Sequence, residues 1–141
     1  MSFERRWLLK DRVCYIQFTA TIALADVKEL SSRHQALSVA NERRNPIHYI
    51  VDTTKVIDYP RDIRSINRQL AGRITGIGWM LMITNDYFIE HLCNVFAQLF
   101  HFNVRMSSSL KDAYRFLQSI DEVVSLPQSW PDNIHDTMPI R

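Results

Sequence analysis

Residues 77–83 have the sequence IGWMLMI, and the predicted fold is built around them. This stretch is apolar along its whole length, which is typical of a strand that is covered on both faces. Three polar residues, Thr84-Asn85-Asp86, follow it, and a helix is predicted from there to Phe100. A buried strand that leads directly into a helix predicts the centre of an open α/β sheet, and ligands of such sheets bind at the carboxyl ends of the strands.

The composition is that of one globular domain. The chain has 141 residues, of which 46% are hydrophobic and 23% charged, and this length allows a sizeable core. No apolar run is long enough to cross a bilayer, and the N-terminus lacks the apolar core of a signal peptide. Cys14 and Cys93 lie in apolar segments, which indicates buried thiols rather than a disulfide. We therefore expect a cytoplasmic protein without a transmembrane segment.

Charge is distributed unevenly along the chain. The net charge of +2 is too small to indicate a nucleic-acid partner. Residues 60–76 contain four arginines and one aspartate, a balance of +3, whereas residues 109–141 contain three basic and five acidic residues, a balance of −2. Two regions of opposite charge suit a homodimer, which Trp130 also suggests, or an anionic partner. The alternative is that both are solvated faces.

Two short strands are predicted at the N-terminus. Residues 4–9 and 12–20 alternate between polar and apolar positions, and Lys10-Asp11 provides a turn, so the strands form an antiparallel hairpin. The alternation places four residues on one face of the first strand: Phe3, Arg5, Trp7 and Leu9. A helix is predicted over residues 21–41. His34 interrupts its apolar stripe, and we expect this histidine to be partly buried and hydrogen-bonded rather than catalytic.

The third predicted strand, residues 46–54, ends in polar residues. Asp52-Thr53-Thr54 follow an apolar run, at the position where open α/β sheets place binding groups. Asp52 has a second interpretation, in which its carboxylate caps backbone amides of the following turn. The sequence leaves these two roles open.

A helix with an arginine face is predicted after the third strand. Pro60 suits its first turn, and Gly72 or Gly76 supplies its C-cap. Three arginines recur at three- and four-residue steps on one face: Arg61, Arg64 and Arg68. The glycines match neither of the phosphate-binding glycine patterns, so no phosphate loop is predicted here.

The second half of the chain holds the other binding candidates. Three serines follow a last strand over residues 102–106, and Ser109 and Asp112 begin the final helix as a capping box. The serines suit an anion at a helix N-terminus, although capping and solvation also explain them. Side chains at the predicted strand ends form a candidate ligand-binding rim: Asp52, Thr53, Thr84, Asn85, Ser107 and Ser108.

The helix that follows Asp86 is apolar on one side and polar on the other. Its predicted inward residues are Phe88, Leu92, Val95, Phe96 and Leu99. Its polar side carries His91 and His101, which are too far apart for a helical metal pair, because that needs a step of about four residues. We therefore expect no metal site and no cofactor.

The order of elements gives the fold class. Two strands, a helix and three strand–helix pairs predict a single α/β domain whose five-stranded mixed sheet has an antiparallel N-terminal hairpin, parallel βα units and four helices. Tyr49-Ile50-Val51-Asp52, and Val104-Arg105-Met106 followed by Ser109–Leu117, resemble motifs of the SpoIIAA-like group, the STAS-type domains of anti-sigma-factor antagonists. The resemblance covers roughly residues 3–120. It implies a domain over residues 1–122 and a partly packed C-terminal tail over residues 123–141.

The resemblance also implies a function. Members of the group are regulatory modules without their own catalysis that bind a protein partner, and some relatives bind nucleotides, lipids or other small ligands. In the antagonists a serine that follows an aspartate, at the start of the helix after the third strand, is phosphorylated to switch binding. The corresponding stretch here, Ile57-Asp58-Tyr59-Pro60-Arg61, has no serine, so the phosphoswitch is not expected. The partner-binding residues implied by the match are Asp58, Tyr59, Arg61, Arg64 and Arg68.

Two functions therefore compete. The first is a module that docks a protein partner through the arginine helix. The alternative is a small-ligand binder, with an anionic or nucleotide ligand over the rim, or an apolar ligand in a sheet–helix cavity near Trp79, Phe88 and Phe96, aromatic residues of a kind that is more often plain core. No Ser-His-Asp order, nucleophile elbow or carboxylate pair is present, so no catalytic residues are predicted.

Overall fold

The computed structural model describes residues 3–40, 45–121 and 124. They form one five-stranded sheet in the order β1-β2-β3-β4-β5, in which β1 and β2 are antiparallel and all other pairs are parallel. The elements are β1 (Phe3–Leu9), β2 (Val13–Phe18), α1 (Leu24–Ala40), β3 (Ile47–Asp52), α2 (Ile63–Leu70), β4 (Ile77–Ile83), α3 (Tyr87–Phe100), β5 (Asn103–Met106) and α4 (Leu110–Ile120). The predicted α/β fold with a mixed sheet and four helices is confirmed.

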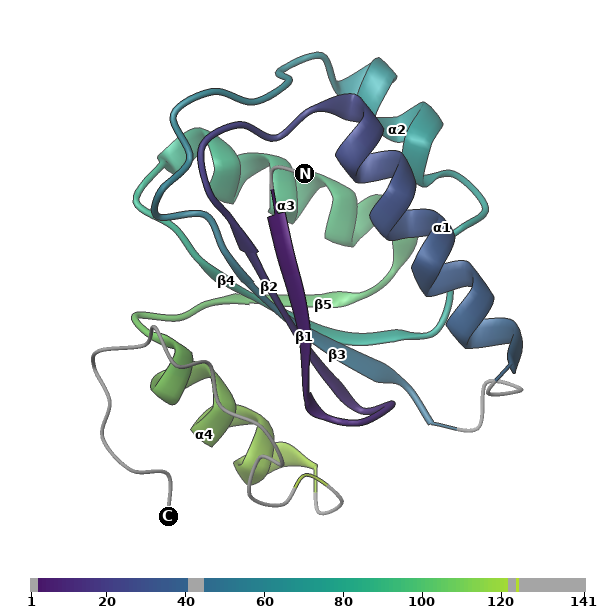
Figure 1. Ribbon diagram of the computed structural model, residues 1–141, viewed down its shortest axis with the longest axis vertical. Helices are drawn as coiled ribbons and strands as arrows, with labels where there is room; N and C mark the ends of the chain where they lie inside the picture. The colour runs from purple at the N-terminus through teal and green to yellow at the C-terminus, as the bar shows by residue number, and fades with distance from the viewer. Residues whose placement is uncertain (1–2, 41–44, 122–123, 125–141) are drawn as a thin grey trace.

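Helices cover both faces of the sheet. Figure 1 shows α1, α2 and α3 on one side and α4 alone on the other. The strands bury side chains on both faces, because β2 is buried at every position and β3 at all but its last. None of the helices in the described part of the chain is long and apolar enough to span a membrane.

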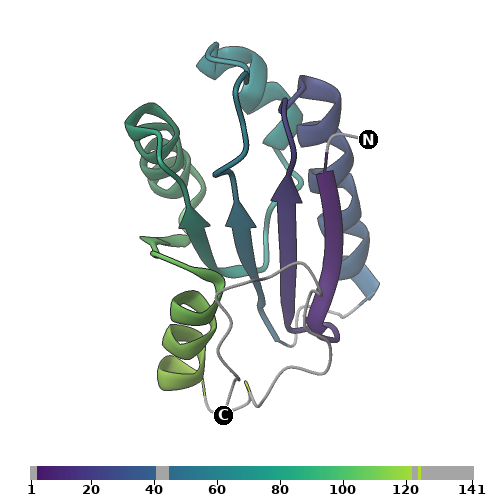
Figure 2. The ribbon, with the colours of Figure 1, turned by 60° about the vertical axis from the view of Figure 1, so that its left-hand side comes forward.

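The middle of the sheet is β3 rather than β4. The strand over Ile77–Ile83 forms as predicted, but it is second from the edge, between β3 and β5 (Figure 2). The sequence did not distinguish the two strands because β4 is also covered on both faces. Met80 and Met82 pack on the α1–α3 side, and Leu81 packs on the α4 side.

A bulge near the end of β1 changes one predicted face. Phe3 and Trp7 pack on the α1–α3 side, as the alternation predicts, whereas Leu9 packs with Leu8 on the α4 side. The register shifts between Trp7 and Leu9, so one extra residue turns the end of the strand over. The prediction for Leu9 was therefore wrong. The turn that follows has Asp11 in the left-handed conformation, with φ of 63°.

Helix α2 begins later than the sequence predicted. Its N-cap is Asp62, whose side chain accepts a hydrogen bond from the Arg64 backbone N–H, so Pro60 lies before the helix and not in its first turn. At the other end Ala71 is the C-cap, and Gly72 follows it with φ of 75°. Gly72 therefore supplies the left-handed residue that ends the helix, as expected for one of the two candidate glycines.

Helix α3 has a different inward face from the predicted one. Its buried residues are Ile89, Leu92, Phe96 and Ala97. Leu99 is 55% exposed and Phe88 is 37% exposed, so these two predicted core residues point away from the sheet. Most turns of this helix carry apolar residues on more than one side. The spacing of apolar residues therefore predicts the helix but not which of its sides faces the sheet.

The core has two parts. One lies between the sheet and α1–α3 and contains Phe18, Val51 and Phe96. The other lies between the sheet and α4 and contains the fully buried Tyr114 and Leu117. Both cysteines in the described residues are free, and burial raises the pKa of Cys14 to about 11 and that of Cys93 to about 12.

The C-terminal tail is described only at Val124, which is 5% exposed and packs in the α4 part of the core. The other tail residues, including Trp130, lie outside the described residues. The domain boundary predicted at residue 122 therefore stays a prediction.

Candidate functional site

The predicted rim residues lie at one edge of the sheet. Asp52 is paired with Ile83 across β3 and β4, and Met82 is paired with Met106 across β4 and β5. The polar residues that follow these three strands therefore come out on the same side of the molecule. The structure brings the predicted rim together.

Three of the six predicted rim side chains, those of Asp52, Thr53 and Thr84, already make hydrogen bonds within the protein. The Asp52 carboxylate accepts hydrogen bonds from the Thr54 backbone N–H at 2.9 Å, the Thr54 hydroxyl at 2.7 Å and the Tyr15 hydroxyl at 3.3 Å. Thr53 donates its hydroxyl to the Ile83 carbonyl at 3.2 Å, and the Thr84 hydroxyl accepts the Asp86 N–H at 3.1 Å. Of the two roles left open for Asp52, capping of the turn is the one its contacts show.

The serines mainly begin α4. The Ser109 hydroxyl accepts the Asp112 N–H at 3.0 Å, which is the first bond of the predicted capping box, and the Asp112 carboxylate accepts the N–H of Ser108, the residue before the N-cap, at 3.2 Å. The buried Ser107 hydroxyl has no hydrogen-bond partner among the described residues. Because Asp112 brings a negative charge to this helix end, the position does not favour an anion.

A cavity lies between the sheet and helices α1, α2 and α3. Its volume is about 220 Å³, and its wall is almost entirely carbon. The sheet contributes Val51 and Met82 to this wall, and the helices contribute Leu30, Leu70 and Phe96. Among the described residues none that lines the cavity is an aspartate, glutamate, lysine or arginine.

A hydrogen-bonded pair forms the polar part of the cavity wall. His34 Nδ1 lies 2.6 Å from the Tyr49 hydroxyl, and His34 Nε2 lies 2.6 Å from the Thr75 carbonyl oxygen. A carbonyl only accepts, so Nε2 carries the proton, and Nδ1 accepts the Tyr49 O–H. Burial lowers the pKa of His34 and raises that of Tyr49, which keeps both groups neutral. The expectation that His34 is buried and hydrogen-bonded is confirmed.

Helix α1 is attached to its neighbours by polar side chains. Its buried residues are the polar Asp26, Ser31, His34 and Ser38, whereas its aliphatic Val27, Leu30 and Leu37 are partly buried against the core. Ser31 donates to the Gln69 carbonyl at 2.7 Å, Gln35 to the Gly72 carbonyl at 3.3 Å, and His34 to the Thr75 carbonyl. These polar contacts hold α1 against the end of α2 and the segment leading to β4, and the cavity remains beside them.

Tyr59 connects the cavity to the predicted partner-binding surface. It is buried, lines the cavity, and donates its hydroxyl to the Asp86 carboxylate at 2.8 Å. That hydrogen bond is the largest cause of the lowered pKa of Asp86, the N-cap of α3, whereas burial is the largest cause of the raised pKa of Tyr59. The Arg61 guanidinium lies 4.5 Å from the centre of the Tyr59 ring, and Phe88 stacks against the same ring.

The other predicted partner-binding residues lie on the surface. Arg64 and Arg68 on α2 and Asp58 before it are all exposed. Ile57 is 83% exposed beside them in sequence, and its backbone N–H is fixed by the Ala20 carbonyl at 2.8 Å.

The three aromatic residues suggested for an apolar site separate in the structure. Phe96 lines the cavity. Phe88 lies outside on the Tyr59 ring, and Trp79 lies on the opposite face of the sheet against Phe116. Tyr49 was not predicted as a cavity residue; its place in the apolar third strand, three residues before Asp52, was the available signal.

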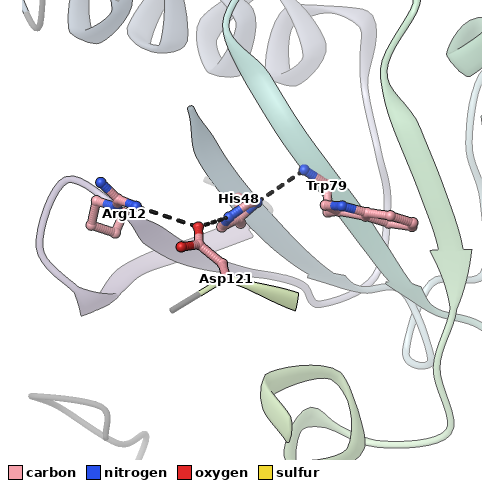
Figure 3. Close-up of polar contacts among 4 residues, drawn as sticks. All are labelled: Arg12, His48, Trp79 and Asp121. Carbon is pink, nitrogen blue, oxygen red and sulfur yellow. Dashed lines mark hydrogen bonds and ion pairs between the residues drawn. The ribbon is translucent and has the colours of Figure 1, made fainter. Parts of the chain in front are cut away.

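A second polar cluster lies at the other end of the sheet (Figure 3). His48 is only 3% exposed. Its Nδ1 accepts a hydrogen bond from the Trp79 backbone N–H at 3.0 Å, and its Nε2 lies 2.9 Å from the Asp121 carboxylate. Arg12 also reaches that carboxylate, at 3.3 Å. This cluster ties the end of α4 to β2, β3 and β4. It contains no nucleophile, and the described residues hold no group of three or more metal-ligating side chains.

Comparison with known proteins bears on the fold. A crystal structure of an uncharacterized protein from the DUF3478 family of Shewanella loihica PV-4, described as having a SpoIIAA-like fold, superposes with a TM-score of 0.57. The alignment covers 82% of this chain and 91% of that chain, at 12% sequence identity. This chain has a SpoIIAA-like fold. By sequence, no protein-family model and no curated protein matches it. The likeness therefore confirms the predicted resemblance at the level of the fold.

Proposed function

We propose that this protein is a non-catalytic binding module that takes up a small apolar ligand between its sheet and helices α1–α3. The cavity of about 220 Å³ carries this proposal. Apolar cavities of about 150 Å³ stay dry and bind benzene, because water finds no hydrogen-bond partners in them. A larger cavity of the same character takes a ring with a short chain, or an alkyl chain.

The rim supports a ligand less well than the cavity does. Asp52, Thr53 and Thr84 already have hydrogen-bond partners within the protein. A nucleotide or another anion there would face the Asp52 carboxylate and would have to displace these bonds. The alternative of an anionic rim ligand therefore ranks below the apolar ligand.

A series of primary alcohols tests the proposal. Each methylene that enters the cavity contributes about 0.8 kcal/mol, so affinity measured by isothermal titration calorimetry rises about fourfold per carbon from 1-pentanol to 1-octanol. Native mass spectrometry of the purified protein is expected to show a co-purifying small molecule. Absence of alcohol binding together with absence of a bound molecule would reject the proposal.

A cavity-filling variant provides the matched comparison. Val51→Phe places a ring in the cavity from β3, and we expect it to weaken 1-octanol binding at least tenfold. Val39→Phe adds the same ring at a position on α1 that is 65% exposed, and binding should stay as in the parent protein. Equal binding by both variants would place the ligand elsewhere.

A protein partner is the second candidate, and the exposed side chains before and on α2 favour it. Ile57 is 83% and Ile63 is 37% exposed, and the cationic Arg64 and Arg68 lie on the same segment. Apolar side chains beside arginines are typical of protein interfaces. An acidic protein surface is the partner that this combination suits.

Charge reversal tests the second candidate. Arg64→Glu with Arg68→Glu should abolish the capture of an acidic partner, whereas Arg115→Glu, at an exposed position on α4, should leave it unchanged. Capture by the parent protein should also weaken as salt is raised, because exposed charges are screened. A partner that is retained by the double variant, at low and high salt alike, would exclude this surface.

A further inference from the structure

We infer that the cavity selects an uncharged ligand and rejects carboxylates and phosphates. The inference rests on the proposed function, and it names the chemical class of the ligand. An alkyl or aryl alcohol, an amide or a plain hydrocarbon fits this class, whereas a fatty-acid anion or a phosphorylated molecule does not.

The first support is the absence of positive charge from the cavity wall. None of the described residues that line it is a lysine or arginine. Two basic residues lie near the wall: the Arg61 guanidinium is 4.5 Å from the centre of the Tyr59 ring, and the charge of Arg5 lowers the pKa of Tyr49 against the larger, opposite effect of burial. Neither arginine is among the residues that line the cavity. A buried anion needs a cation or several donors to replace its lost hydration.

The second support is that the strong donors on the wall are already used. Each hydroxyl or ring N–H that lines the cavity has an acceptor inside the protein. The donor–acceptor pairs are Tyr49 to His34, His34 to the Thr75 carbonyl, Tyr59 to Asp86, Thr53 to the Ile83 carbonyl and Ser31 to the Gln69 carbonyl. Only the Cys93 thiol remains, and a thiol is a weak donor. A carboxylate or phosphate in the cavity would find nothing to bind its oxygens.

The wall still has acceptor capacity. A tyrosine oxygen both donates and accepts, so the Tyr49 oxygen, which donates to His34 Nδ1, retains a lone pair. A ligand with one O–H or N–H can donate to it without breaking the pair. The arrangement therefore favours a neutral ligand that carries at most a hydrogen-bond donor.

Calorimetry with two probes of equal chain length tests the inference. 1-Octanol and sodium octanoate are titrated into the full-length protein at pH 7.0 and at pH 5.5. We expect octanoate to bind about 100-fold or more weakly than 1-octanol at pH 7.0. Its affinity should rise about thirtyfold at pH 5.5, because only the protonated acid enters and its share grows tenfold per pH unit.

The pH dependence belongs to the ligand and not to the wall. The titratable residues lining the cavity are His34, Tyr49, Tyr59 and Cys93. Burial lowers the pKa of His34 and raises those of the other three, so all favour their neutral forms. 1-Octanol does not titrate between pH 5.5 and 7.0, so it is the control for any pH-dependent change in the cavity itself. Its affinity should be the same at both pH values.

The outcomes separate the inference from the proposed function. Octanoate that binds as tightly as 1-octanol at pH 7.0 would overturn the inference while leaving an apolar cavity ligand in place. Loss of that octanoate binding in Arg61→Ala would show that the carboxylate stays outside, against the guanidinium, and the inference would still be wrong. Failure of both probes to bind at either pH would overturn the proposed function as well.

Discussion

The His48 ring packs so closely against Gly78 that no side chain fits at residue 78. A Cβ at Gly78 would lie 2.6 Å from Cε1 and Nδ1 of the His48 ring. The ring is held from two sides, because Nδ1 accepts the Trp79 N–H and Nε2 contacts the Asp121 carboxylate. The glycine therefore allows a buried imidazole to lie directly against the backbone of β4.

Gly78→Ala should destabilise the protein by about 2 kcal/mol or more, because the methyl group displaces the ring and breaks its bond to Trp79. Urea unfolding measures this change. Gly72→Ala is the comparison, since a Cβ there meets nothing within 4 Å and the cost, about 1 kcal/mol, comes only from its φ of 75°.

His48→Ala provides the second half of this test. In that background Gly78→Ala should cost clearly less than in the parent protein, because the ring is gone. Equal costs in the two backgrounds would show that the His48 ring is not what limits the space at Gly78.

His34 should make stability depend on pH. Burial lowers its pKa in the folded protein below the ordinary 6.5, so the unfolded chain takes up the proton first as pH falls. The free energy of unfolding should be constant with respect to this group above pH 6.5 and should fall below it, by at most about 1.4 kcal/mol per pH unit.

Urea unfolding at pH 7.5 and 5.5 compares the parent protein with His34→Gln, whose amide still donates to the Thr75 carbonyl. The parent protein should lose about 1 kcal/mol more stability than the variant on acidification. The same loss in both proteins would assign the pH dependence to other groups.

At this scale the sequence predicted the environment of His34 correctly and missed that of His48. His34 interrupts an apolar helical stripe, which marks it as buried. His48 lies in an apolar strand, but its partners Trp79 and Asp121 are 31 and 73 residues away, and no local pattern records such contacts.

Helix α1 differs from the other helices because it buries small and polar side chains. Ser31, Gln35 and His34 reach carbonyl groups near the end of α2 and in the segment that leads to β4. A helix attached in this way leaves room beside it, whereas bulky aliphatic residues at the same positions would fill the cavity.

Ser31→Ala should cost about 1 kcal/mol, because it removes the bond to the Gln69 carbonyl, which then keeps only the bond from the Arg73 guanidinium. Ser32→Ala changes the neighbouring, exposed residue and should stay within about 0.5 kcal/mol of the parent protein. Chemical denaturation of the two variants under the same conditions gives the comparison. Indistinguishable costs would mean that the Ser31 contact does not hold α1.

The elements were largely predictable from the sequence, and their faces less so. Alternation gave the hairpin and apolar runs gave the other strands, because these patterns follow from backbone geometry. The outward positions of Phe88 and Leu99 and the bulge near Leu9 were not predictable, since each depends on which neighbour the element meets in three dimensions.

The described residues form one sheet whose two faces are covered by different numbers of helices. Helix α4 closes one face with fully buried residues such as Tyr114 and Leu117. Three helices cover the other face, and the cavity lies between them and the sheet. The order of elements and two short motifs were sufficient to predict this fold. The cavity was not predictable in the same way, because it is the space that several elements leave between them.

Filling the cavity should also change stability. Val51→Phe adds apolar surface where the parent protein has empty space, so its free energy of unfolding should stay within about 1 kcal/mol of the parent value or exceed it. The same change at Ile50, which is fully buried on the α4 face, should cost about 1–3 kcal/mol from overpacking. Equal losses at both positions would argue against space on the α1–α3 side.

A ligand that enters this space should change the environment of its methionines, which methyl NMR with labelled methionines measures. Met80 and Met82 both line the cavity. We expect their methyl signals to move saturably as 1-octanol is added, and we expect Val51→Phe to abolish the change. Signals that stay fixed in the parent protein, or that move equally in the variant, would contradict this expectation.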